Sequence, residues 1–125
     1  MAEAIRMMKA VLVEPLKKPR IVTIPAQLSY IQEMIGSHIE ATYPWPDEVA
    51  LVCSDEGKFD GSAPNRVLED YDVIFGPFLI CGLTRTDFGS LSDELAEKYM
   101  EMFKYPELIT GTVDGNIACI RLVEE

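Results

Sequence analysis

The residues with the most usable chemistry lie in the run 61–66, which reads Gly-Ser-Ala-Pro-Asn-Arg. Arg66 and Arg85 are two of the few cations in an acidic body. An arginine in such surroundings either pairs with carboxylates or receives an anion through its bidentate fork. Asn65 follows a proline, and its amide can hydrogen-bond a base, a ribose or a carboxamide. Asn65, Arg66 and Arg85 are therefore the predicted ligand-binding residues, for a small anionic ligand such as a nucleotide signal.

A structural role for the same run is the competing interpretation. Arg66 would then tie its loop to Asp60, Glu69 or Asp70, and Asn65 would make a local turn bond. Loops also carry function more often than other segments do. Both interpretations therefore stay open at the level of the sequence.

Motifs of the common catalysts are missing from the sequence. It has no nucleophile elbow, no dinucleotide fingerprint, no P-loop and no H-E-x-x-H zinc motif. The one histidine, His38, lacks an orienting partner for a nucleophile–base pair and a second ligand pair for zinc. The run 69–72, Glu-Asp-Tyr-Asp, has oxygen ligands that suit a divalent cation, although such acidic runs more often form the solvated start of a strand. We expect no enzyme activity, no catalytic residue, no metal site and no cofactor.

Charge is unevenly distributed along the chain. The net charge is −10, yet residues 1–20 contribute +3, so the remainder carries −13. A field of this sign repels phosphate backbones, so we expect no direct nucleic-acid binding. A small acidic protein acting on a basic surface of another protein is compatible with the same charge.

Candidate partner contacts are Trp45, Glu69 and Asp70. Trp45 stands between two prolines, which excludes it from the middle of a strand. It is interpreted first as a rim residue that covers the core, and otherwise as a partner contact, because tryptophan is enriched at binding hot spots. Glu69 and Asp70 would supply further, acidic contacts to a partner.

The cysteines and the N-terminus bear on the cellular compartment. Cys53, Cys81 and Cys119 are odd in number, lack paired spacing and sit among aliphatic residues, so they are predicted to be buried free thiols. No apolar run reaches the length of a membrane span. The first nine residues have an early acid and no long apolar stretch, so no signal peptide is predicted. We expect a cytoplasmic protein without a membrane partner.

Apolar periodicity and turn residues predict the elements in order. A hairpin of strands 9–14 and 20–24 precedes a helix over 26–35, which would start at Pro25, bury Leu28, Ile31 and Ile35, and end at Gly36. The following segments are predicted as strand 37–43, strand 48–54, a hairpin turn at 55–58, a loop or helical turn at 61–68, a strand 71–83 with a bulge or edge at Gly76-Pro77, a helix capped by Ser90 and ended by Tyr105-Pro106, and a hairpin of 108–113 and 116–122 around Asp114-Gly115.

This order has runs of adjacent strands and few helices. It predicts an α+β fold in a single domain, with a mostly antiparallel sheet and two short amphipathic helices. The domain would cover residues 9–125, with residues 1–8 as an N-terminal extension. An exposed strand edge near Pro77 or in the last hairpin would allow a homodimer.

Several short pieces of the sequence form an ordered set. They are residues 11–15 (Val-Leu-Val-Glu-Pro), the helix 28–32 ending at Gly36, the strand 49–53 with its turn 56–58, Pro64-Asn65-Arg66, the segment 71–82, residues 91–94 and Tyr105-Pro106-Glu107. Over about residues 9–107 the chain resembles the domain-of-unknown-function family DUF3846, small proteins of phages, plasmids and Gram-positive bacteria. The resemblance implies a mobile-element setting, in which small acidic proteins often counter host defences.

Two functions follow as hypotheses. The first is a non-enzymatic binding protein of phage or mobile-element type that modulates or inhibits a host (defence) protein through its acidic surface. The second is a protein that binds or sequesters a small anionic ligand at Asn65 and Arg66, with Arg85 contributing.

Overall fold

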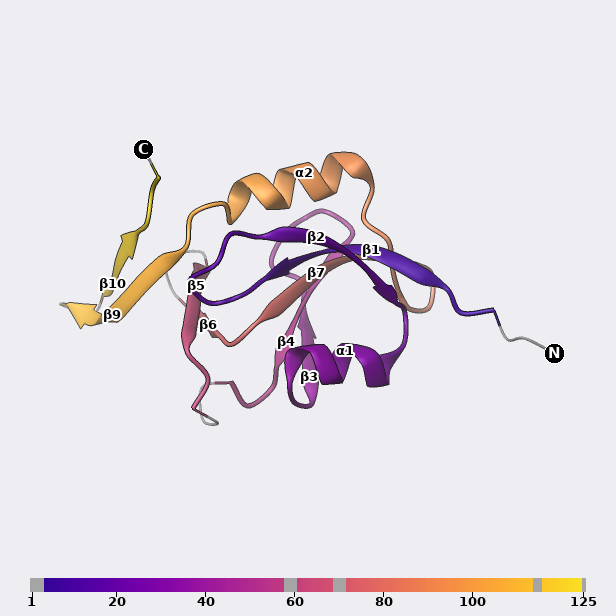
Figure 1. Cartoon of the computed structure of the whole chain (residues 1–125), viewed down its shortest axis with the longest axis horizontal. Helices are drawn as coiled ribbons and strands as arrows, with labels where there is room; N and C mark the ends of the chain where they lie inside the picture. Colours follow the sequence, from indigo (N-terminus) through magenta and orange to yellow (C-terminus); the bar gives the residue numbers. More distant parts are fainter. Residues whose placement is uncertain (1–3, 58–60, 69–71, 114–115, 125) are drawn as a thin grey trace.

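A computed structural model of the chain describes residues 4–57, 61–68, 72–113 and 116–124 (Figure 1). Within them the fold is α+β with mostly antiparallel sheets, as predicted. The elements are β1 (Met7–Val13), β2 (Arg20–Pro25), α1 (Leu28–Ile35), β3 (Ile39–Thr42), β4 (Val49–Ser54), β5 (Pro64–Leu68), β6 (Asp72–Phe75), β7 (Phe78–Leu83), β8 (Phe88–Gly89), α2 (Asp93–Met102), β9 (Glu107–Val113) and β10 (Asn116–Arg121).

The main sheet has the strand order β2-β1-β7-β4-β3, and the short β8 pairs with β7. Every pair in it is antiparallel. The predicted hairpin of β1 and β2 is confirmed, although β1 begins at Met7 and fully buries Met8, which was assigned to the extension. All six residues of β4 are buried, because both faces of the sheet are covered.

The two faces of the main sheet bear separate hydrophobic cores. Side chains of a strand alternate between faces, so the neighbours Phe78 and Leu79 of β7 enter different cores. Helix α1 lies on the Leu79 side and contributes Ile31. Helix α2 lies on the Phe78 side and contributes Tyr99 (Figure 1).

Two small sheets accompany the main one. β9 and β10 form the predicted C-terminal hairpin, with its turn outside the described residues. The loop predicted for 61–68 is confirmed for 61–63 but wrong for 64–68, because β5 pairs with β6 there. The hairpin turn predicted at 55–58 is also wrong, since β4 pairs with β3 and β7 and not with the next strand. The irregularity predicted at Gly76-Pro77 is a break between two sheets, made by Gly76 at φ 77°.

Both helices differ from prediction at their starts. α1 begins at Leu28 after the N-cap Gln27, because Pro25 still belongs to β2, and Leu28 is exposed instead of buried. α2 is capped by Ser92, whose hydroxyl accepts a hydrogen bond from Leu95 N. The predicted cap, Ser90, instead accepts a hydrogen bond from Lys9 N of β1.

One cysteine prediction is wrong. Cys53 and Cys81 are buried free thiols, whereas Cys119 is exposed, because it lies on the protruding β9–β10 hairpin (Figure 1).

A candidate binding cleft between β3 and β6

Asn65 is fully buried and bonded to the main chain. Its amide donates to Val13 O of β1 at 2.9 Å and to Gly76 O at 2.8 Å. It therefore joins β5 to the end of β1 and to the break before β7. Both N–H donors of the amide thus satisfy carbonyls of the protein, which would cost free energy if they were buried without a partner.

Arg66 is 1% exposed, and its guanidinium serves the main chain of three segments. It donates to Asn65 Oδ1 at 2.9 Å and to Asn65 O, to Lys17 O at 2.8 Å and to Phe103 O at 3.1 Å. Burial lowers the pKa of Arg66, and the charge of the nearby Glu107 opposes that shift. Its remaining donor, Nε, is buried without a hydrogen-bond partner among the described residues.

The predicted set Asn65, Arg66 and Arg85 is not brought together. Asn65 bonds the main chain just before β7, whereas Arg85 is exposed in the loop just after it. A six-residue strand separates the two sites by about 20 Å. The carboxylates considered as partners of Arg66 (Asp60, Glu69 and Asp70) lie outside the described residues, and so do the partner contacts proposed at Glu69 and Asp70.

Trp45 covers part of the core on the α2 face. Its ring lies 4.7 Å from that of Tyr99 and 6.0 Å from that of Phe103, centroid to centroid. Asp47, two residues on, accepts hydrogen bonds from Tyr99 Oη at 2.7 Å and from Lys98 Nζ at 2.6 Å. Trp45 thus lies at the rim of the core and remains half-buried.

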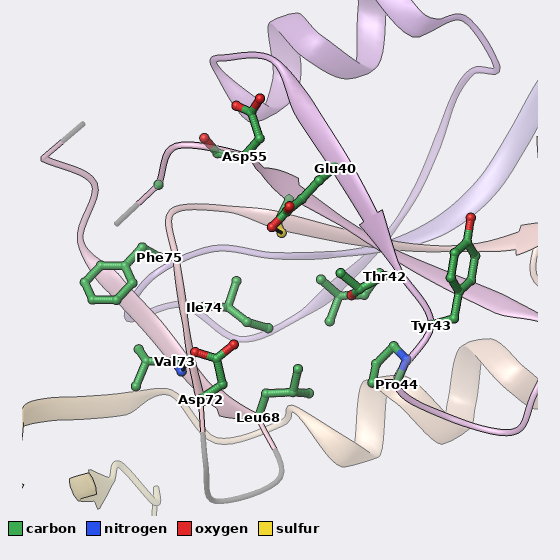
Figure 2. A pocket seen from close by; sticks show the side chains of 14 residues that line it. Glu40, Thr42, Tyr43, Pro44, Asp55, Leu68, Asp72, Val73, Ile74 and Phe75 are labelled. Atoms are coloured by element: carbon green, nitrogen blue, oxygen red, sulfur yellow. Dashed lines mark hydrogen bonds between the residues drawn. The ribbon is translucent and has the colours of Figure 1, made fainter. Parts of the chain in front are cut away.

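A cleft of about 420 Å³ opens between β3 and the β5–β6 hairpin (Figure 2). Its floor is apolar and includes the half-buried Leu68, Val73 and Phe75, which lie beside the buried Leu51 and Ile74. Glu40 and Thr42 of β3 line one side, and Asp72 of β6 lines the other. The volume falls in the range of small-molecule and side-chain binding sites.

The alternation of β3 explains how polar groups reach this cleft. Ile39 and Ala41 pack toward the α1 core, so Glu40 and Thr42 project from the other face. On that face Glu40 is opposite Cys53 and Thr42 is opposite Leu51. Polar side chains at the edge of an otherwise apolar sheet face leave the adjacent space open to solvent.

The cleft is acidic. Glu40, Asp55 and Asp72 line it, and none of the described lining residues is a lysine or an arginine. One oxygen of Asp72 accepts a hydrogen bond from Val73 N at 2.8 Å. Carboxylates around an apolar floor favour a ligand that is cationic at one end and aliphatic along its length.

The thiol in the cleft is not activated for chemistry. Cys53 Sγ donates to Glu40 Oε1 at 3.8 Å. Burial, and next the negative charge of Glu40, raises the pKa of Cys53 to about 11. Because the thiolate is the nucleophilic form, Cys53 stays protonated and unreactive near neutral pH.

The described residues offer neither a metal cluster nor a membrane-spanning helix. No group of three or more His, Cys, Asp or Glu side chains is arranged to hold a metal ion there. Among the described helices, none combines the length and the apolar character that a bilayer crossing needs.

The fold and the cleft define a small α+β domain with an acidic, ligand-sized cleft that contains one thiol of raised pKa. The chain belongs to the family described as domain of unknown function DUF3846, which matches residues 8–104. The match confirms the family resemblance and contains the described cleft residues, whereas the β9–β10 hairpin lies beyond it. No curated protein and no solved structure matches the chain significantly.

Proposed function

We propose that this protein is a non-enzymatic binding protein that receives a basic side chain of another protein in the cleft between β3 and β6. The observation that carries the proposal is the cleft itself, with carboxylates on two sides and an apolar floor. Lysine and arginine side chains have a matching form, because their aliphatic stems pack on apolar surface while their charged heads seek carboxylates.

The net charge of −10 supports the same function. Long-range attraction of a basic partner raises the association rate, and the cleft then fixes the contact. In the mobile-element setting that the family resemblance implies, the partner would be a cytoplasmic host protein, and docking would modulate or inhibit it. The raised pKa of Cys53, which disfavours the nucleophilic thiolate, is consistent with binding instead of catalysis.

Selection of peptides from a random displayed library tests this function without knowledge of the partner. We expect the wild-type protein to enrich peptides rich in lysine or arginine. The double variant Glu40→Gln, Asp55→Asn should bind them about tenfold more weakly, because two carboxylates of the cleft lose their charge. Binding should also weaken as salt is raised.

The matched control is Glu94→Gln, Glu97→Gln. It makes the same change in net charge on the exposed side of α2, so it should bind the selected peptides nearly as the wild type does. Enrichment of acidic peptides, or equal losses in the two double variants, would contradict a role for the cleft.

The second hypothesis, a small anionic ligand at Asn65 and Arg66, has less support. Both side chains are buried, and their bonded donors already serve carbonyls and an amide oxygen of the protein. A thermal-shift screen against nucleotides tests it, since a ligand at a hundred times its Kd adds about 2.7 kcal/mol to the stability. The cleft proposal predicts no such shift.

A further inference from the structure

β3 is the outermost strand of the main sheet, with no neighbour beyond it among the described residues. The hydrogen bond from Asp55 N to His38 O, 3.1 Å long, fixes which main-chain groups of this segment face β4. In an antiparallel pair, alternate residues exchange both main-chain hydrogen bonds with the residue opposite. In the register of β3 and β4, Glu40 and Thr42 therefore direct their N–H and C=O groups toward β4.

Ile39 and Ala41 consequently direct their N–H and C=O groups away from β4, toward the open edge. Within the described part of the chain, these groups have no main-chain hydrogen-bond partner. The side chains of both residues pack toward the α1 core. A polar main-chain edge thus runs along the acidic cleft, and such edges readily pair with another chain.

From this edge and the cleft beside it, we propose that an extended, basic segment of the partner protein adds to the main sheet as a further antiparallel strand beside β3. The inference rests on the proposed function, because it states how the occupant of the cleft is held. Main-chain hydrogen bonds to Ile39 and Ala41 supply affinity in this mode, and a cleft for alternate side chains supplies selectivity.

The negative charge of Glu40 and of the whole protein indicates which kind of strand can pair with the open edge of β3. An added strand places a side chain opposite or diagonal to Glu40 on the cleft face. A second copy of this chain, paired through β3, would bring its own Glu40 near that position. Each copy also carries a net charge of −10, so like charges would oppose the pairing. A lysine or an arginine from another protein meets the opposite charge instead.

The geometry also specifies the pattern of the incoming segment. Every second side chain would face the cleft, where a basic head reaches Glu40 and its stem packs on the apolar lining of the cleft. The intervening side chains would lie beside Ile39 and Ala41 at the edge of the α1 core, which favours apolar residues. The segment therefore alternates basic and apolar residues.

Hydrogen exchange with a peptide of alternating lysine and valine tests strand addition. In the free protein, the amides of Ile39 and Ala41 should exchange rapidly, and those of Glu40 and Thr42 slowly. Saturating peptide should slow exchange at Ile39 and Ala41 by at least about tenfold, because both amides become ladder donors. Failure of the peptide to bind, or unchanged exchange at both amides in the complex, would overturn the inference.

Two N-methylated peptides separate strand addition from charge attraction. In the antiparallel arrangement, the valine N–H groups face β3 and the lysine N–H groups face solvent. Methylation of the valine nitrogens should weaken binding by at least about tenfold, whereas methylation of the lysine nitrogens should change it much less. Both peptides keep the full charge.

The outcomes distinguish this inference from the proposed function. Equal affinity for both methylated peptides, together with a loss in Glu40→Gln, Asp55→Asn, would overturn strand addition and leave the acidic cleft as a binding site. Protection of Ile39 and Ala41 that grows with protein concentration, without peptide, would assign the edge to a second copy and overturn the inference as well.

Discussion

Replacing Arg66 with alanine is expected to lower the free energy of unfolding by about 3–5 kcal/mol. The guanidinium donates to Lys17 O in the β1–β2 turn and to Phe103 O at the end of α2. It also donates to Asn65 Oδ1, which orients the neighbouring amide. The substitution leaves the buried acceptors of Asn65 and Phe103, and the partly buried Lys17 O, without this donor. It also opens a cavity among three segments that are distant in sequence. Urea unfolding followed by circular dichroism measures the change.

Arg85→Ala is the matched control for this prediction. It removes the same side chain from an exposed loop and should change the stability by no more than about 0.5 kcal/mol. Arg66→Lys should fall between the two, because lysine keeps the charge but lacks the planar fork. If Arg66→Ala unfolded at the same urea concentration as Arg85→Ala, the guanidinium would not hold these segments together.

The placement of Arg66 also shows what the sequence could not provide. An arginine at this place correctly indicates that residues 64–66 have a specific role, because a buried cation needs oxygen acceptors. Two of those acceptors are carbonyls 49 and 37 residues away, in Lys17 and Phe103. No local pattern encodes such distances. The run therefore resembles a loop in composition, although tertiary hydrogen bonds hold it as the strand β5.

Elements made by local interactions were predicted well. The β1–β2 hairpin follows from two apolar runs around a proline-lysine turn, and α1 ends at Gly36 in the left-handed conformation that glycine favours. The predictions were wrong where a side chain forms a hydrogen bond with a residue that is distant in the sequence. Serine is a favoured helix cap, yet the Ser90 hydroxyl accepts a hydrogen bond from Lys9 N, 81 residues away in the sequence. Ser92 caps the helix instead.

The cleft was missed for the same reason. The alternation of residues 37–43 predicted a strand but gave no sign that it would be the edge of the sheet. Asp72 was considered only as part of an acidic run, and its position across from Glu40 depends on the β5–β6 pairing. Because Asn65 and Arg66 fix β5 to the rest of the fold, the residues predicted to bind a ligand position one wall of the cleft.

Gly82→Ala is the second substitution with a large expected effect, a loss of about 2–3 kcal/mol in the free energy of unfolding. A Cβ atom at Gly82 would collide with the carbonyl group of Ser90, whose carbon would lie only 2.9 Å away. Main-chain atoms cannot rotate aside as a side chain can. The segment 90–91 would have to move, and thermal or urea unfolding would report the loss.

The position of Ser90 matters because it places α2 on the sheet. Ser90 Oγ accepts from Lys9 N at 2.9 Å, and Leu91 N donates to Lys9 O at 2.8 Å. Asp93, in the first turn of α2, forms an ion pair with Lys9 Nζ. A shift of Ser90 would disturb all three contacts together and loosen the helix that covers the Phe78 side of the core.

Gly89→Ala separates this mechanism from a general intolerance of larger residues in β7 and β8. Gly89 is the register partner of Gly82, but its added Cβ would meet the methyl group of Thr84, 2.7 Å away. The Thr84 side chain can turn about its Cα–Cβ bond, but its hydroxyl then loses its exposed hydrogen bonds with Asp87 O and Asp87 N. The expected cost is therefore about 1 kcal/mol, less than at Gly82, where main-chain atoms must move. If the two substitutions lowered the free energy of unfolding equally, disturbed β7–β8 pairing, and not the close approach of Ser90, would explain the loss. A larger loss at Gly82 would show that a glycine in the sheet fixes the start of α2.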